Sequence, residues 1–240
     1  MSFTYSEQAY NTKSAEVVLP LLFEIYKPNS IVDIGCGNGT WLKVIDKYGI
    51  EDYLGIDGSY ISTNDLYIPT NKFISQDLSK PINLNKKFDL VISLEVAEHI
   101  EPQAAEIFVK NLVKHGNTIL FSGAIPKQGG FMHVNEQYPS YWIDIFSKFS
   151  FSFYDIIRPN IWNNTEVKFW YRQNTFIVAN AESPISKQYK PSLILDCIHP
   201  ELYDKYVKSA ERANDIENGG GGIKLSTQIL LKAIKNKLNI

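Results

Sequence analysis

The sequence predicts an α/β fold with a mostly parallel sheet of seven strands, helices on both faces, an antiparallel hairpin at one end and a C-terminal helical extension. Three observations predict it. Short apolar runs alternate with helical segments over the first half of the chain, which is typical of βαβ units. Two later apolar runs are separated only by a turn-rich segment, which indicates a hairpin. The last part of the chain carries helical patterns alone.

The elements are predicted from their periodicity and their end signals. The predicted strands are residues 31–34, 53–57, 72–77, 88–94, 117–123, 151–157 and 174–180. The predicted helices are residues 14–26, 40–49, 103–114, 141–149, 201–214 and 223–238. Pro20 interrupts the first helix, and Gly49 ends the second. The run at 88–94 is nearly all apolar, as expected for a strand that is buried on both faces.

Length and composition limit the function classes. A chain of 240 residues suits one domain with an extension, and we place the boundary between residues 1–182 and 183–240. The net charge of −2 makes nucleic acid an unlikely partner. Neither Cys36 nor Cys197 belongs to a CxxC pair, so the sequence supports neither a thiolate zinc site nor a disulfide framework. We expect no membrane span and a cytoplasmic location, since no leader or long apolar run is seen.

The most specific signal is the stretch VDIGCGNGTWL at residues 32–42, where three glycines follow a strand and precede a helix. Such a turn needs residues without a Cβ, because the backbone bends sharply and a ligand approaches it closely. Asp57 closes the next strand, where a carboxylate can accept hydrogen bonds from a ribose. These features leave a dinucleotide and another adenosyl ligand open. Thr40 in the last glycine position, and Asp33 at the loop entrance, favour a sulfonium over a pyrophosphate.

In order and spacing, these segments resemble the class I S-adenosylmethionine-dependent methyltransferases, whose sheet is Rossmann-like and seven-stranded. The resemblance rests on VDIGCGNGTWL, YLGIDGS, ISQDLS, FDLVISLEVAEHI and NTILFSG, within residues 28–125. It implies that Asp33, Gly35 and Gly37 hold the methionine part of the cofactor. It also implies that Asp57 holds the ribose and Asp77 the adenine. The predicted cofactor-binding residues are Asp33, Gly35, Cys36, Gly37, Asp57, Gly58, Asp77, Leu78 and Leu94.

A cluster of polar residues follows the fourth strand, in the stretch EVAEHI at 95–100. On a helix, Glu95 and His99 share a face. The pattern resembles ubiquinone-pathway O-methyltransferases and small-RNA 3′-terminal 2′-O-methyltransferases, and the latter hold a divalent cation with two acids and two histidines. His133 supplies the other histidine here. The predicted metal ligands are Glu95, Glu98, His99 and His133, which suit Mg²⁺, Mn²⁺ or Fe²⁺.

The stretch GGFMHVNEQYPSYW at 129–142 resembles bacterial methyltransferases of surface-glycan and secondary-metabolite pathways. Its polar side chains suit a polyol or a phosphate-bearing substrate, although they could also serve the loop itself. If no metal binds, His133 or His99 becomes the candidate base. The predicted catalytic residues are His133, His99, Glu98 and Glu136. Phe3, Tyr5 and Tyr10 are candidates for a lid over the cofactor, with plain helix packing as the alternative.

The predicted function is O-methylation of a small hydroxylated acceptor, such as a sugar or a nucleotide-linked or phosphorylated precursor of a surface glycan. N-methylation and RNA 2′-O-methylation remain alternatives. From other classes, a nicotinamide-dependent oxidoreductase and a non-catalytic cofactor-binding subunit are kept as rivals. The basic helix at 223–238 suits an anionic surface or, more often, docking on its own domain or a partner, which allows a homodimer through the C-terminal helices.

Overall fold

The computed structural model describes residues 11–193, 195–218 and 220–238. The chain divides into two compact units, residues 1–197 and 198–240. The first unit therefore extends beyond the boundary predicted after residue 182. It does so because the helix α7 (Pro184–Gln188) and Leu195 both contribute buried side chains to its core.

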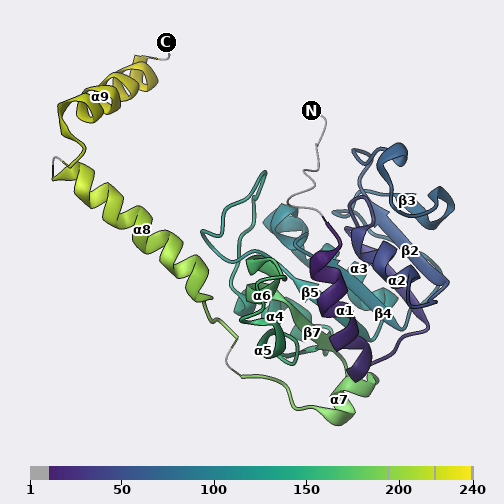
Figure 1. Ribbon diagram of the computed structural model, residues 1–240. Coiled ribbons are helices and arrows are strands. Elements are labelled where there is room, and N and C mark those ends of the chain that lie inside the picture. Colours follow the sequence, from purple (N-terminus) through teal and green to yellow (C-terminus); the bar gives the residue numbers. More distant parts are fainter. Residues whose placement is uncertain (1–10, 194, 219, 239–240) are drawn as a thin grey trace. The chain divides into compact units, whose positions relative to one another are not determined.

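A sheet forms the centre of the first unit (Figure 1). It has seven strands in the order β3-β2-β1-β4-β5-β7-β6. The strands are β1 (Ser30–Ile34), β2 (Asp52–Asp57), β3 (Phe73–Ser75), β4 (Leu90–Leu94), β5 (Thr118–Ser122), β6 (Ser152–Tyr154) and β7 (Phe176–Ala179). The first five strands pair in parallel, whereas β7 is antiparallel to both β5 and β6. The predicted fold class is thus confirmed, including the antiparallel end.

Helices cover both faces of the sheet and bury its apolar side chains. One face packs against α1 (Lys13–Ile25), α2 (Thr40–Asp46) and α7, and the other packs against α3 (Ala105–His115) and α4 (Pro139–Ser147). Every residue of β1, β4 and β5 is buried. This layering explains why the central strands read as continuous apolar runs.

Two sequence predictions about local structure were wrong. Pro20 does not interrupt the first helix, because Ala15, Val18, Leu19 and Leu22 still bury one continuous face against the sheet. The segment between β6 and β7 is not free of helices, since it contains α5 (Arg158–Ile161) and α6 (Phe169–Asn174). The buried Arg158, which pairs with Asp155, organises this segment in a way that periodicity does not reveal.

The other short elements lie around the sheet edges. They are the 3₁₀ helices η1 (Thr63–Asp65), η2 (Thr70–Lys72), η3 (Ala97–His99) and η4 (Pro102–Ala104). Since β1 pairs with both β2 and β4, their carboxyl ends meet at one edge of the sheet. The glycine loop, Asp57 and the EVAEHI stretch all begin at this edge.

The second unit consists of α8 (Pro200–Glu217) and α9 (Gly222–Leu238). Gly221, which lies between them, and Gly222, the first residue of α9, both have positive φ angles. Among the residues described, no helix is long and apolar enough to cross a membrane.

Candidate active site

The glycine loop between β1 and α2 has the backbone geometry that its sequence predicts. Gly35, Gly37 and Gly39 have φ angles of 95°, 55° and 87°, a region that residues with a Cβ rarely adopt. A Cβ added to Gly35 would lie 2.2 Å from Cγ2 of Val96, so this loop passes directly against the chain that leaves β4. The glycine loop and the EVAEHI stretch are therefore in direct contact.

Two buried carboxylates border the loop. Asp57 Oδ2 accepts a hydrogen bond from the backbone N–H of Gly37 at 2.6 Å, and its Oδ1 accepts one from that of Gly58 at 2.6 Å. The Tyr60 hydroxyl also donates to Oδ1. Burial raises the pKa of Asp57 despite these bonds, and burial with the nearby charge of Asp57 raises the pKa of Asp33 well above its usual range.

Tyr60 is a contact of this region that the sequence did not indicate. Its ring lies against Gly58, where an added Cβ would come within 2.2 Å of it, yet 57% of the residue is exposed. Gly58 therefore provides room for an aromatic ring beside the Asp57 carboxylate. No motif pointed to Tyr60, because a tyrosine three residues after a strand is common in surface loops.

The remaining predicted cofactor residues differ in their surroundings. Cys36 is buried, and a Cβ on Gly55 would lie 2.8 Å from its Sγ, so the thiol packs toward β2 and its pKa is raised by burial. Leu78 and Leu94 belong to the two apolar cores. Asp77 is exposed beyond the end of β3, and Ser79 donates to its Oδ1 through both backbone and side chain, which lowers its pKa.

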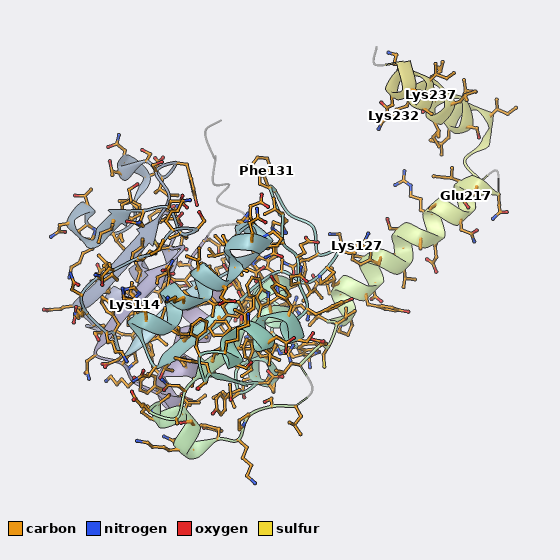
Figure 2. All side chains as sticks on the ribbon, turned by 180° about the vertical axis from the view of Figure 1, so that it is seen from behind. Lys114, Lys127, Phe131, Glu217, Lys232 and Lys237 are labelled. Atoms are coloured by element: carbon orange, nitrogen blue, oxygen red, sulfur yellow. The ribbon has the colours of Figure 1, made fainter. Side chains whose placement is uncertain are left out.

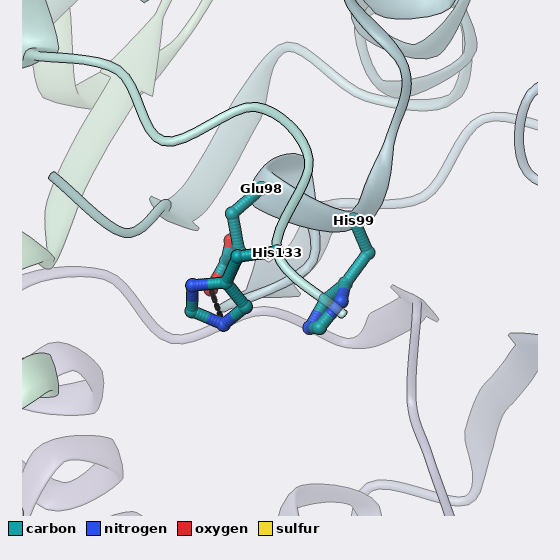
Figure 3. Close-up of side chains that lie close together, drawn as sticks. All are labelled: Glu98, His99 and His133. Carbon is teal, nitrogen blue, oxygen red and sulfur yellow. Dashed lines mark ion pairs between the residues drawn. The ribbon is translucent and has the colours of Figure 1, made fainter. Parts of the chain in front are cut away.

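Three of the four predicted metal ligands come together at the end of β4 (Figure 3). One ligand atom each from Glu98, His99 and His133 lies within 4.8 Å of the others. Glu98 Oε1 is 3.9 Å from His133 Nε2, and the two imidazole rings meet edge to face with centroids 4.9 Å apart. Burial, together with the charge of Glu95, raises the pKa of Glu98 well above its usual range. Among the described residues, neither Glu98 oxygen has a hydrogen-bond partner.

Hydrogen bonds to the other ring nitrogens orient both histidines. His133 Nδ1 lies 2.8 Å from Glu136 Oε1, and His99 Nδ1 lies 3.3 Å from the carbonyl oxygen of Met132. Both partners are acceptors, so each Nδ1 carries a proton and each neutral ring keeps a lone pair on Nε2. His99 is exposed as a whole residue, but partial burial of its ring and the neighbouring His133 lower its pKa, which favours its neutral form.

Glu136 closes the loop that carries His133. Besides the imidazole, its carboxylate accepts hydrogen bonds from the backbone N–H groups of Lys127 at 2.7 Å and Gly129 at 2.8 Å. Glu136 therefore serves the loop and His133, and we describe it as a positioning residue. Phe131 projects from the tip of this loop and is 62% exposed (Figure 2).

The neighbouring polar groups also serve the loop. Asn135 Oδ1 accepts a bond from Gln137 Nε2. The backbone N–H groups of Val134 and Asn135 both donate to the carbonyl oxygen of Glu98, which attaches the loop to η3. The HVNEQ stretch thus holds the loop in place over the end of β4.

Glu95 is the predicted ligand that the structure does not bring into the cluster. The expected helical face is missing, because Glu95 has a left-handed φ of 55° and only a single 3₁₀ turn follows it. Its carboxylate instead accepts hydrogen bonds from Gln128 and Asn174. Sequence reasoning missed these two amides, because neither belongs to a recognised motif. The predicted lid residues Phe3, Tyr5 and Tyr10 lie outside the described part of the chain.

Comparison with known proteins identifies the class. The family description "Methyltransferase domain" matches residues 5–124, which is half of the chain. A search of curated proteins found no significant match.

Solved structures share the fold. The methyltransferase domain of bacterial CtHen1 has a TM-score of 0.53 at 15% identity, over 71% of this chain and 99% of that one. Streptomyces venezuelae DesVI has a TM-score of 0.54 at 12% identity, over 71% and 92%. The plantazolicin methyltransferase BpumL in complex with SAH has a TM-score of 0.51 at 16% identity, over 72% and 87%. At these identities, the likeness shows the fold alone.

The fold and the family match together define a class I S-adenosylmethionine-dependent methyltransferase. The chain belongs to the methyltransferase-domain family. This membership confirms the resemblance found in the sequence and decides against the nicotinamide-dependent oxidoreductase.

Proposed function

We propose that the protein is an O-methyltransferase for a small hydroxylated acceptor, such as a sugar or a phosphorylated or nucleotide-linked precursor of a surface glycan, and that it uses a divalent cation. The observation that carries this proposal is the Glu98 carboxylate, buried without a hydrogen-bond partner among the described residues, with His99 and His133 beside it. Burial disfavours the charged form of such a carboxylate, and a bound cation would compensate for that cost.

The residues around the glycine loop fit S-adenosylmethionine. Gly35 and Gly37 leave the backbone open to close approach, and the buried acids Asp33 and Asp57 suit an ammonium or sulfonium and a ribose diol. The cofactor supplies an electrophilic methyl group. The chain's own part is to hold the acceptor oxygen in line with the carbon–sulfur bond, and such positioning accounts for much of the rate in displacement reactions.

The donor set at the end of β4 fits a hard or borderline divalent cation. One carboxylate and two neutral imidazole nitrogens are typical ligands of Mn²⁺ and Fe²⁺, and Mg²⁺ is possible when water completes the shell. Glu98, His99 and His133 would hold the ion, whose charge favours the deprotonated form of an acceptor hydroxyl. Glu136 fixes the His133 tautomer, as carboxylates commonly do behind metal-binding histidines.

The same histidines give the site a second route to activate the acceptor. In the neutral form of His133, Nε2 carries the lone pair, because the Nδ1 proton is directed to Glu136. In the absence of a cation, this nitrogen is the one placed to accept the proton of an acceptor hydroxyl, with Glu136 stabilising the imidazolium that forms.

The carboxylate and two histidines also suit a vicinal diol, and that observation favours RNA 2′-O-methylation as a second candidate. The net charge of −2 argues against it, since nucleic-acid sites are usually basic.

Exposed apolar residues of α9, among them Leu230 and Ile234, would provide a contact between two copies. A homodimer of this kind would appear in light scattering at micromolar concentration.

The test measures cation binding and methyl transfer on the same preparation. Mn²⁺ is titrated calorimetrically into the metal-free protein, and transfer from labelled S-adenosylmethionine is assayed on nucleotide sugars, free sugars and RNA, with EDTA or Mn²⁺. We expect Mn²⁺ to bind, EDTA to lower transfer to the sugars strongly, and His133→Ala to weaken both binding and transfer. The exposed Glu101→Gln variant is the control. Full activity in EDTA with no Mn²⁺ binding would remove the cation from the proposal.

A further inference from the structure

A closed ring of three side chains lies beside the cation cluster. Glu95 Oε2 accepts a hydrogen bond from Gln128 Nε2 at 2.9 Å, and its Oε1 accepts one from Asn174 Nδ2 at 3.0 Å. The same Asn174 nitrogen lies 2.8 Å from Gln128 Oε1 and completes the ring. Gln128 is 4% exposed and Asn174 is 2% exposed, while Glu95 is partly buried, so solvent reaches the ring only from the Glu95 side.

The three residues come from separate parts of the chain, and two of these parts carry members of the cluster. Glu95 leaves the end of β4, Gln128 lies in the loop that carries His133, and Asn174 ends α6. Gln128 also lies between Lys127 and Gly129, the two residues whose N–H groups Glu136 holds. A displacement of Gln128 therefore acts directly on the partner of His133.

The backbone at Glu95 adds a second, independent observation. A left-handed φ of 55° at a residue with a side chain is unfavourable, and it persists only where its surroundings hold it. Here the Glu95 N–H donates to Ser122 Oγ at 2.9 Å, while the two amides hold its carboxylate. This conformation directs the side chain to Gln128 and Asn174, and leaves Glu95 out of the group formed by Glu98, His99 and His133.

We infer that Glu95 is a positioning residue of the transfer reaction, which fixes the His133 loop through Gln128 and Asn174 and does not itself bind the cation. This inference rests on the proposed function, because the loop carries one of its ligands. It separates the four polar residues predicted from the sequence into a cation-binding set and a set that holds the loop.

The ring allows a test by exchange of partners. Glu95→Gln removes the carboxylate, and Gln128→Glu places a second one beside the first. The double variant Glu95→Gln/Gln128→Glu restores one carboxylate and one amide with the direction of their hydrogen bond reversed. Asn174 Nδ2 already points to the oxygen of residue 128, so it can donate to the new carboxylate. A direct cation ligand could not be exchanged in this way.

Hydrogen–deuterium exchange of residues 126–137 reports the loop without reference to cation or acceptor. We expect Glu95→Gln to speed this exchange, weaken Mn²⁺ binding about tenfold and lower kcat roughly 10- to 100-fold with KM for S-adenosylmethionine unchanged. The double variant should recover all three, and Glu101→Gln should change none.

Two outcomes would overturn the inference. In the first, loop exchange is the same in Glu95→Gln as in the wild type. In the second, the double variant recovers loop exchange while Mn²⁺ affinity stays low, which would make Glu95 a ligand. If the wild type binds no Mn²⁺, the proposed cation use fails, and loop exchange still decides the role of Glu95.

Discussion

Glu136→Gln tests the role of the carboxylate that orients His133. In the wild type, this carboxylate accepts three hydrogen bonds, from His133 Nδ1 and from the N–H groups of Lys127 and Gly129. Glutamine keeps the shape of glutamate but offers one oxygen and one NH₂ group. If its NH₂ group faces His133, the imidazole must accept at Nδ1, and the proton moves to Nε2, the atom needed by a cation or an acceptor hydroxyl.

The size of the effect follows from these three bonds. Hydrogen bonds to a charged acceptor contribute about 1.5–3 kcal/mol each, and neutral ones about 1 kcal/mol. The loss is therefore roughly 1 kcal/mol per bond, and solvent reduces it because 19% of the Glu136 side chain is exposed. We expect the loop to lose about 1–2 kcal/mol and Mn²⁺ affinity to fall about 10- to 100-fold, the usual effect of removing such a partner.

Calorimetric titration with Mn²⁺ measures the affinity, and ¹⁵N shifts of the imidazole nitrogens report the His133 tautomer. Glu101→Gln makes the same chemical change at an exposed acid nearby and serves as the control. An unchanged tautomer together with an unchanged Mn²⁺ affinity would refute the reasoning. A loss of affinity without a change of tautomer would show that the loop, and not the proton, is what Glu136 controls.

Two further predictions concern stability. Gly35→Ala should lower the free energy of unfolding by about 2–5 kcal/mol and abolish binding of S-adenosylhomocysteine. The new Cβ would clash with Val96, and residue 35 would have to keep a positive φ that alanine disfavours. Gly49 has a φ of 73° and nothing within 4 Å of an added Cβ, so Gly49→Ala introduces backbone strain without a clash. It should lower the free energy of unfolding by about 1 kcal/mol. If urea unfolding gives equal losses for the two variants, the clash with Val96 does not contribute. Burial lowers the pKa of His115 in the folded state, so the unfolded chain takes up this proton first, and stability falls as pH drops below about 6.5. Between pH 7.5 and 5.5, the free energy of unfolding of His115→Gln should therefore fall less than that of the wild type. An identical fall in both proteins would show that other groups cause it.

The sheet and the glycine loop were predictable because local sequence determines them. Buried parallel strands are apolar throughout, and a strand-to-helix turn without Cβ atoms leaves glycines at fixed spacing. The pairing of Gly37 with Asp57 follows from the same pattern, since adjacent parallel strands end at one edge. The second unit was predicted as helices, although its start lies at residue 198.

The arrangement of the site was only partly predictable. Glu98, His99 and His133 meet as expected, because each follows a strand that ends at the same edge. The conformation of Glu95 was not predictable, since a spacing of four residues reads as a helical face and a left-handed φ leaves no mark in the sequence. The partners of Glu95 lie far away in the chain, and the side chain of Asn174 is 79 residues distant in sequence. Contacts of that range depend on the completed fold.

The hydrogen bonds at Asp57 have a consequence for how the cofactor enters. A carboxylate offers about four lone-pair positions, and here Gly37, Gly58 and Tyr60 already use three of them. A ribose diol that binds at Asp57 brings two more donors, so one present donor has to leave. Two of them are backbone groups held by the loop, whereas Tyr60 is a largely exposed side chain. The free energy of cofactor binding then includes the cost of displacing the Tyr60 hydroxyl from Asp57. The fluorescence of Tyr60 should therefore change when the cofactor binds.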